Sequence, residues 1–259
     1  MRWSAVAVLA LAFALWLPAG ASAAPPTAPP EAFVDLADVD PSILVEMRYT
    51  TSHNFIGRPI AGYNDPVCIL SRQAAEVLSH VQSEVRRRGY TLKVYDCYRP
   101  QRAVDDFVAW GKRLGDQRMK REFYPRVDKR RVFKDGYIAT QSGHSRGSTL
   151  DVTLVRRPPG PVGRYRRGQA LVDCAAPRSA RFRDNSIDMG TGYDCFDPLS
   201  HPFNARIGKV QRRNRLVLRR AMYREGFKGL ETEWWHFTLR DEPFPETFFD
   251  FPVSRAALR

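Results

Sequence analysis

The stretch SGHSRGSTLDVTL, Ser142 to Leu154, joins a glycine-containing turn to a segment rich in β-branched residues. That composition predicts a strand over Thr149 to Leu154, with the segment around His144 as the turn just before it. Glycine tolerates the backbone angles of a tight turn, so His144 can fold back toward Asp151 on the strand. The stretch therefore predicts an imidazole beside a carboxylate at one end of a strand.

A second stretch, ETEWWHF at Glu231 to Phe237, places Glu233 three residues before His236. The residues Trp234 to Leu239 have the composition of another strand. On a regular strand, side chains three positions apart point to opposite faces of the sheet. A site that uses both residues therefore requires a turn or bulge near Trp234.

The rest of the chain mixes helices and strands without the steady rhythm of a parallel sheet. We expect helices over 71–88, from Pro100 onward and over 210–225, and further strands over 90–98 and 137–140. The last helix should bury Val210, Val217, Leu218 and Ala221. This order predicts an α+β fold, a single domain in which helices flank a central, mostly antiparallel sheet.

Imidazole and carboxylate groups are the ligands that a catalytic zinc favours, and three protein ligands leave one position for water. His144, Asp151 and His236 could supply this set. Glu233 would then be free to take a proton from the attacking water and hand it to a leaving amine. Each motif alone is also typical of satisfied polar residues in turns, and His201 fits either a structural role or a place near the site.

The N-terminus has the pattern of an export signal. Arg2, an apolar run and the small residues Ala21 to Ala23 predict a signal peptide over 1–23 that is cut before Ala24. The apolar run is short for a membrane span, so we expect no stable membrane insertion. A flexible leader over 24–31 and one domain over 32–259 would follow, in a protein that is exported and either periplasmic or secreted.

The chain carries a formal net charge of +13, and ten of its basic residues lie between Lys112 and Lys134. A solvated basic helix face is the simplest interpretation of this stretch. An exported protein would also meet anionic cell-wall polymers or lipid head groups there, and we expect no nucleic-acid partner. The four cysteines favour disulfides in an oxidising compartment, with Cys68–Cys97 and Cys174–Cys195 as the preferred pairing of three.

Four motifs together resemble the VanX-type D-alanyl-D-alanine dipeptidases, zinc peptidases related to the D,D-carboxypeptidases and to the hedgehog fold. These motifs are SGHSRGSTLDVTL, ETEWWHF, YDCYRPQRAV and DMGTGYDCFD, and the likeness runs from about Phe33 to Phe248. The resemblance implies a hedgehog-like or D,D-peptidase-like fold and one Zn²⁺ per chain.

The resemblance also implies roles for individual residues. Zinc would be held by His144, Asp151 and His236, with Glu233 as general base. Arg99, at a strand-to-helix junction, would stabilise the developing oxyanion. The residues expected to bind a small dipeptide substrate are Asp194 for its ammonium group, Tyr49 in the same pocket and Ser142 as a hydrogen-bond donor.

Three functions remain open at this point. The first is an exported zinc dipeptidase that hydrolyses D-Ala-D-Ala in peptidoglycan precursor turnover or recycling. The second is a D,D- or L,D-carboxypeptidase that acts on peptidoglycan stem peptides. The third is a wall-binding module that keeps zinc for structure, although a structural metal would need neither Glu233 nor Arg99.

Overall fold

A computed structural model describes residue 1, residues 26–27 and residues 31–258 of the chain. The predicted signal peptide, apart from Met1, and most of the predicted leader lie outside these residues. No helix in the described part is both long and apolar enough to cross a bilayer.

A five-stranded sheet in the order β2-β4-β5-β7-β6 forms the centre of the domain. β4 and β5 are antiparallel, as are β5 and β7, and β7 and β6, whereas β2 runs parallel to β4. The prediction of an α+β domain with a mostly antiparallel sheet is confirmed. The strands are β1 (Phe33–Asp35), β2 (Leu44–Val45), β3 (Ile69–Ser71), β4 (Tyr90–Asp96), β5 (Thr149–Arg156), β6 (Phe227–Gly229) and β7 (His236–Leu239).

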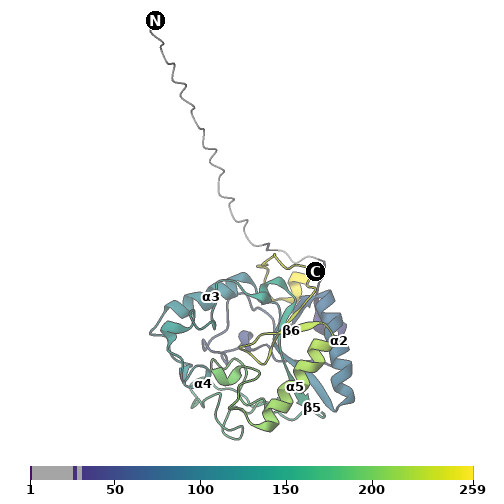
Figure 1. The fold of residues 1–259 in the computed structure, drawn as a ribbon, viewed down its shortest axis with the longest axis vertical. Helices are drawn as coiled ribbons and strands as arrows, with labels where there is room; N and C mark the ends of the chain where they lie inside the picture. Colours follow the sequence, from purple (N-terminus) through teal and green to yellow (C-terminus); the bar gives the residue numbers. More distant parts are fainter. Residues whose placement is uncertain (2–25, 28–30, 259) are drawn as a thin grey trace.

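Helices flank this sheet (Figure 1), with α2 and α5 side by side along one side of it and α3 and α4 on the other. The α-helices are α1 (Leu36–Val39), α2 (Arg72–Arg87), α3 (Gln101–Lys112), α4 (Lys120–Phe123) and α5 (Lys209–Arg224). The 3₁₀ helices are η1 (Arg48–Thr50), η2 (Lys129–Arg131), η3 (Gly143–Arg146), η4 (Pro198–Ser200) and η5 (Arg255–Leu258).

The cap and the buried face that the sequence predicts for α2 are both present. The Ser71 hydroxyl accepts a hydrogen bond from the Ala74 amide, which caps the first turn. Leu78, Val81 and Val85 are fully buried. They lie on one face because residues three or four apart share a side of a helix. The helix therefore begins and ends within one residue of the predicted range.

Two predictions from the apolar pattern are wrong. Residues 137–140 form no strand, because the amides of Tyr137 and Ile138 both donate to the Val132 carbonyl in a tight turn. In α5, Val210 is 62% exposed, while Leu218 and Ala221 are buried as expected.

Arg215 explains the difference in α5. Its side chain is buried, and its guanidinium donates to the carbonyl oxygens of Met189, His201 and Leu199 at 2.6, 2.6 and 2.8 Å. A hydropathy pattern assigns arginine to the solvent face, yet here it occupies the buried one. The interpretation of 112–134 as one basic helix face is also wrong, since α3 ends at Lys112 and α4 has only four residues.

Both preferred disulfides are present. Cys68 is bonded to Cys97 and Cys174 to Cys195. The first bond ties the residue that precedes β3 to the residue that follows β4. The second ties the loop after β5 to the residue that follows Asp194. Each crosslink therefore fixes a segment that carries predicted site residues.

The corrected face of α5 predicts a contrast in stability. Leu218→Ala should lower the free energy of unfolding by about 2–5 kcal/mol, because it leaves a cavity in a buried cluster. Val210→Ala should change it by less than about 0.5 kcal/mol, since the side chain is already in solvent. Urea unfolding of the two variants measures both values, and comparable losses would contradict the assignment of the buried face.

Candidate active site

Three side chains at the ends of neighbouring strands build one side of the site. Asp96 lies opposite Asp151 across β4 and β5, and Asp151 lies opposite His236 across β5 and β7. Paired residues of an antiparallel ladder project to the same face of the sheet. A shift of register between Val94 and Asp96 turns the Asp96 side chain onto this face. Two carboxylates and an imidazole therefore form a row across three strands.

His144 reaches this row from η3, the turn before β5. The Ser142 hydroxyl accepts a bond from the His144 amide, and Gly147 ends the turn with φ +83°. A Cβ at Gly147 would lie 2.2 Å from the Phe33 ring, so no other residue fits there without displacing that ring. The predicted turn that folds His144 back onto the strand is confirmed.

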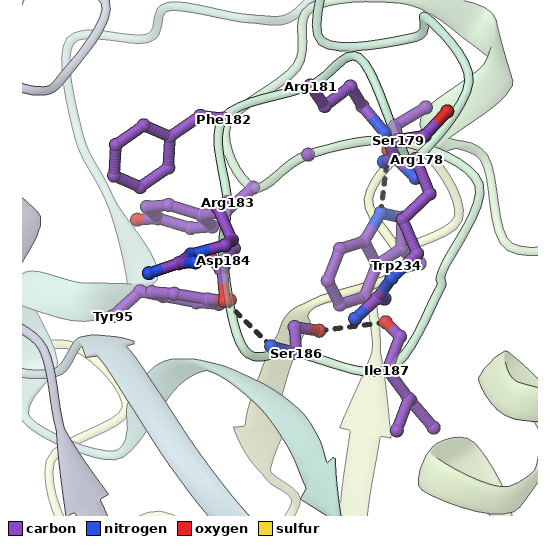
Figure 2. Close-up of a pocket in the computed structure, with 13 residues that line it drawn as sticks. Tyr95, Arg178, Ser179, Arg181, Phe182, Arg183, Asp184, Ser186, Ile187 and Trp234 are labelled. Carbon is purple, nitrogen blue, oxygen red and sulfur yellow. Dashed lines mark hydrogen bonds between the residues drawn. The ribbon is translucent and has the colours of Figure 1, made fainter. Parts of the chain in front are cut away.

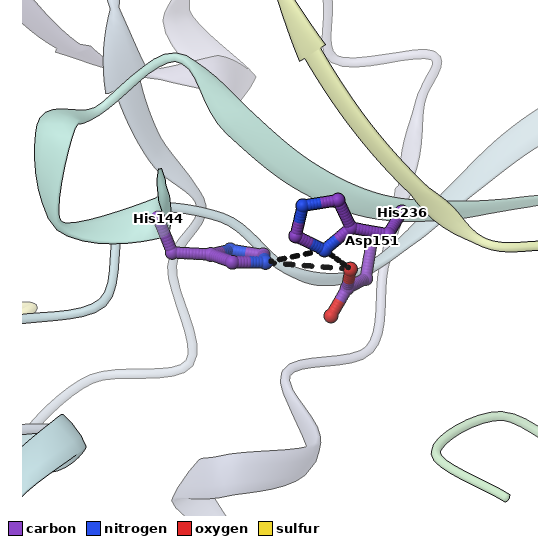
Figure 3. Close-up of side chains that lie close together, drawn as sticks. All are labelled: His144, Asp151 and His236. Carbon is purple, nitrogen blue, oxygen red and sulfur yellow. Dashed lines mark hydrogen bonds and ion pairs between the residues drawn. The ribbon is translucent and has the colours of Figure 1, made fainter. Parts of the chain in front are cut away.

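The ligand atoms of His144, Asp151 and His236 converge (Figure 3). His144 Nε2 lies 3.3 Å from His236 Nδ1, and Asp151 Oδ1 lies 3.4 and 3.3 Å from these two nitrogens. All three atoms lie within 4.8 Å of one another. His144 Nδ1 donates to the Cys97 carbonyl at 2.7 Å. Because a carbonyl only accepts, this bond fixes the tautomer and leaves Nε2 with a free lone pair.

The donor set fits a divalent metal ion. Asp151 Oδ1 is buried, yet it has no hydrogen-bond partner in the part of the chain that the structure describes. Burial opposes the charge of Asp151, but the two imidazoles outweigh it and lower the pKa of that carboxyl. A cation would satisfy a buried carboxylate oxygen that lies 3.3–3.4 Å from two imidazole nitrogens. Two nitrogens and one oxygen form the ligand type of catalytic zinc sites.

Arg99 directs its guanidinium into the same space. Its Nε and Nη2 donate to Asp96 Oδ2 at 3.0 and 2.9 Å, and its Nη1 donates to the Ser142 hydroxyl at 3.4 Å. The guanidinium carbon also lies 5.3 Å from the centre of the Tyr49 ring. Burial disfavours the charge, yet Asp96 outweighs it and raises the pKa of Arg99 well above its ordinary value. Arg99 therefore stays a cation at a fixed position.

Glu233 lies next to His236, one of the three predicted metal ligands. Its Oε2 is 3.6 Å from His236 Nδ1, and the turn at Trp234 and Trp235 brings both side chains to one face, as the sequence required. Burial raises the pKa of Glu233 to about 7, although His236 acts in the opposite direction. A carboxylate with such a pKa both accepts and returns a proton near neutral pH.

Asp194 is a buried carboxylate without a cationic partner among the described residues. Its Oδ2 accepts a hydrogen bond from the Tyr49 hydroxyl at 2.8 Å. Burial and the nearby Asp151 raise the pKa of Asp194 well above its ordinary value. Its backbone has φ +60°, a conformation that few residues other than glycine adopt. A group held in this way is a candidate for binding a charged ligand.

One cavity of about 250 Å³ connects these groups. Its lining includes every predicted catalytic and substrate-binding residue, as well as two of the three metal candidates. Neither His144, the third metal candidate, nor His201 lines the cavity. Larger hollows of about 650 and 630 Å³ lie elsewhere on the surface, but the metal candidates do not line them. The predicted site residues that line the cavity are Tyr49, Arg99, Ser142, Asp151, Asp194, Glu233 and His236.

The sequence did not predict the residues that hold the site's side chains in place. Asp96 holds Arg99, and the Tyr63 hydroxyl donates to Asp96 Oδ1 at 2.6 Å. Tyr193 donates to Asp151 Oδ2 at 2.9 Å. Asp96 precedes Arg99 by three residues and Tyr193 directly precedes Asp194, so proximity to a motif was a signal for both. Tyr63 offered no signal in the sequence.

A family model described as D-Ala-D-Ala dipeptidase matches residues 30–162 and 167–254. The chain belongs to this family. Its members are metallopeptidases, in agreement with the donor set of the site.

Relatives named D-alanyl-D-alanine dipeptidase extend over most of the chain. The protein from Streptomyces coelicolor is 35% identical over 86% of this chain and 98% of its own length. The Enterococcus faecalis protein is 34% identical over 81% of this chain and 92% of its own length. The Escherichia coli protein is 31% identical over 80% of this chain and 83% of its own length. A solved structure of the D,D-dipeptidase VanXYg in complex with a D-Ala-D-Ala phosphinate analogue aligns with a TM-score of only 0.34 at 12% identity. The alignment covers 82% of this chain and 67% of that one.

The two disulfides should differ in their effect on the metal site. Replacing either pair by alanines should lower the free energy of unfolding by about 2–4 kcal/mol. Loss of Cys68–Cys97 should also weaken Zn²⁺ binding, because the Cys97 carbonyl holds His144. Loss of Cys174–Cys195 should leave it within about twofold, because Tyr193, which donates to Asp151, is still held by stacking on Tyr95. Urea unfolding and titration of Zn²⁺ against a chelator measure the two effects, and equal Zn²⁺ affinities would contradict the link to His144.

Proposed function

We propose that this chain is a zinc-dependent dipeptidase that hydrolyses D-Ala-D-Ala to two D-alanines. The observation that carries the proposal is the placement of Asp194 in the same small cavity as Glu233, Arg99 and the metal candidates. A cavity of about 250 Å³ is below the usual range of small-molecule pockets, which favours a substrate of few atoms. The names of the curated relatives support the same substrate.

Each residue has a role that follows from its position. His144, Asp151 and His236 would hold Zn²⁺, which supplies Lewis-acid chemistry when bound. Glu233 would take a proton from the attacking water and deliver it to the leaving amine. Arg99 would stabilise the negative charge that develops on the scissile carbonyl oxygen, and its bonds to Asp96 mean that little reorganisation is needed.

Two groups would bind the ends of the substrate. The Asp194 carboxylate would pair with the free ammonium group, with the Tyr49 hydroxyl beside it. The Ser142 hydroxyl oxygen accepts from the His144 amide and from Arg99, so its own proton is free to donate to the substrate. A buried carboxylate that lacks its cation would disfavour longer or blocked peptides at this end.

The proposal includes export to the periplasm or cell exterior, on the strength of the signal-like N-terminus and two disulfides. There the enzyme would act in turnover or recycling of D-Ala-D-Ala. Contact with anionic wall polymers would use the cations of 112–134 that form no ion pair within the described residues. These are Lys112, Arg113, Lys120, Arg121 and Lys134, whereas Arg118, Arg126, Arg130 and Arg131 are paired and Lys129 is buried.

The second candidate is a carboxypeptidase acting on peptidoglycan stems. Such an enzyme has no ammonium group next to its scissile bond, so a buried Asp194 would have no cation to bind and would remain a desolvation cost. The placement of Asp194 therefore favours the free dipeptide.

Glu233→Ala should separate catalysis from metal binding. We expect kcat to fall by roughly 10²–10⁴-fold, because the proton acceptor is lost. Zn²⁺ content should remain at one ion per chain, since Glu233 is not among the three ligands. Metal analysis and release of D-alanine measure both. A wild type that binds Zn²⁺ but hydrolyses neither D-Ala-D-Ala nor muropeptides would instead favour a wall-binding module.

Asp194→Asn should test the substrate. The substitution keeps the shape but removes the charge, so KM for D-Ala-D-Ala should rise by roughly 10–100-fold, the worth of one charged hydrogen bond. Activity on N-acetyl-D-Ala-D-Ala, which has no ammonium group, is the control and should change far less. Unchanged kinetics with the free dipeptide would remove the dipeptidase proposal.

A further inference from the structure

The two oxygens of Asp151 face different partners. Oδ1 faces the nitrogens of His144 and His236, while Oδ2 accepts a hydrogen bond from the Tyr193 hydroxyl at 2.9 Å. Arg99 Nη2 lies 4.0 Å from the same Oδ2, beyond hydrogen-bond distance. Tyr193 and Arg99 are therefore both close enough to compete for Asp151 Oδ2, and Tyr193 makes the hydrogen bond.

We infer that Tyr193 is a positioning residue that sets the orientation of the Asp151 carboxylate. By donating a hydrogen bond to Oδ2, Tyr193 keeps Oδ1 directed toward the nitrogens of His144 and His236. It also keeps Asp151 from pairing with Arg99. The inference rests on the proposed function for its catalytic consequence, but its effect on metal binding does not depend on any substrate.

The Tyr193 ring is itself held on two sides. It is stacked on Tyr95, with ring centres 4.3 Å apart and planes at 12°, and it meets the edge of Trp235 at 5.5 Å. Packing of this kind leaves little freedom for the ring to rotate away. The Tyr193 hydroxyl is therefore fixed where Asp151 Oδ2 needs a donor.

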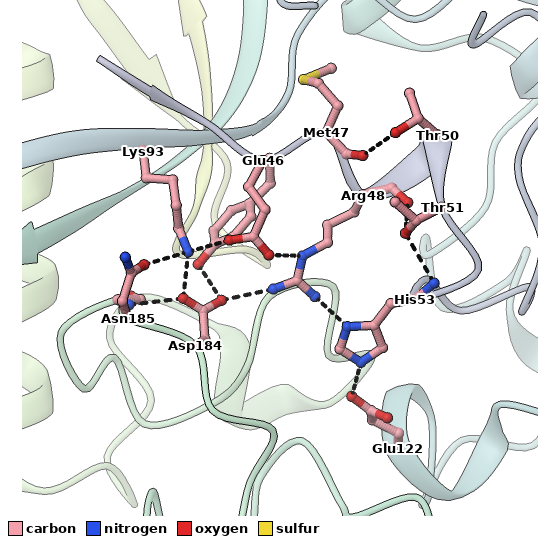
Figure 4. Close-up of polar contacts among 12 residues, drawn as sticks. Glu46, Met47, Arg48, Thr50, Thr51, His53, Lys93, Glu122, Asp184 and Asn185 are labelled. Carbon is pink, nitrogen blue, oxygen red and sulfur yellow. Dashed lines mark hydrogen bonds and ion pairs between the residues drawn. The ribbon is translucent and has the colours of Figure 1, made fainter. Parts of the chain in front are cut away.

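Tyr95 in turn is anchored in a partly buried network of ion pairs. Its hydroxyl donates to Asp184 Oδ2 at 2.7 Å, at the edge of a second hollow (Figure 2). Asp184 also pairs with Arg48 at 2.9 Å and with Lys93 at 2.6 Å, and Glu46 completes the group (Figure 4). Lys93 and Arg48 are almost fully buried. The support for Asp151 thus extends from the site through β4 to the residues next to β2, the edge strand of the sheet.

Loss of the Tyr193 hydroxyl would leave Asp151 Oδ2 buried without a donor. A rotation of the carboxylate toward Arg99 would relieve this cost, because the guanidinium is close and charged. That rotation would draw Oδ1 away from the imidazoles. It would also engage Arg99, which the proposed mechanism needs for the substrate.

Tyr193→Phe tests the inference, because it removes one oxygen and keeps the ring. The affinity for Zn²⁺, measured by competition with a chelator, should fall by roughly 10–100-fold, the usual effect of losing a group that orients a ligand. With saturating Zn²⁺, kcat should fall while KM for D-Ala-D-Ala stays within about twofold, since Asp194 and Tyr49 are untouched.

Tyr98→Phe is the matched control. It also removes a hydroxyl from a buried tyrosine, one that donates to the Phe251 carbonyl at 3.0 Å and contacts no ligand of the metal candidate. Its Zn²⁺ affinity should stay within about twofold of the wild type. An equal loss in both variants, or an unchanged affinity in Tyr193→Phe, would overturn the inference.

A double-mutant cycle distinguishes competition between Tyr193 and Arg99 from a purely structural role of Tyr193. Arg99→Gln removes the cation that competes for Asp151, so Tyr193→Phe should weaken Zn²⁺ binding less in that background than in the wild type. The same penalty in both backgrounds would exclude the competition with Arg99. The Zn²⁺ affinities test the role of Tyr193 even if the wild type fails to hydrolyse D-Ala-D-Ala. That failure would contradict the proposed function but not the inference about Tyr193.

Discussion

The Asp151 carboxylate is the group on which the rest of the site depends. It is buried in the middle strand of the sheet, and two imidazoles and a tyrosine hydroxyl surround it. A charge in such a place is costly unless partners on every side compensate for it. β5 meets this requirement because it is paired on both edges, with β4 presenting Asp96 and β7 presenting His236. Formation of the sheet therefore also assembles most of the site.

The segment from Asp96 to Arg99 performs three tasks within four residues. Asp96 orients the guanidinium, the Cys97 carbonyl fixes the tautomer of His144, and Arg99 enters the cavity. The Cys68–Cys97 bond anchors this segment to the start of β3, and Pro100 is the N-cap residue of α3. The disulfide at Cys97 and the start of α3 together restrict the backbone on either side of Arg99. This restriction explains how a long, flexible side chain keeps one position.

The sequence predicted most of the site and much of the fold, but for different reasons. β5 and α2 have strong local patterns, and their bounds were predicted closely. The meeting of Asp151 with His236 depends on a register that spans more than eighty residues, so only the joint motifs and the family resemblance made it predictable. The predicted strand over 137–140 was wrong because a local turn closed by the Val132 carbonyl replaces it. The predicted burial of Val210 was wrong because tertiary contacts of Arg215 override the apolar pattern. Asp96 and Tyr63 escaped notice because each acts only through another residue.

The balance of charge in the cavity explains why the substrate should carry a free ammonium group. Arg99 and Asp96 neutralise each other, and a divalent ion would be matched by Asp151 and Glu233. Asp194 is then the one acid of the cavity that has no counterpart among the described residues, and burial raises its pKa accordingly. A substrate ammonium would supply the missing charge and restore the carboxylate form. Specificity for a small dipeptide would thus come from the desolvation cost of the buried Asp194 carboxylate, which only a cationic end of the substrate can offset.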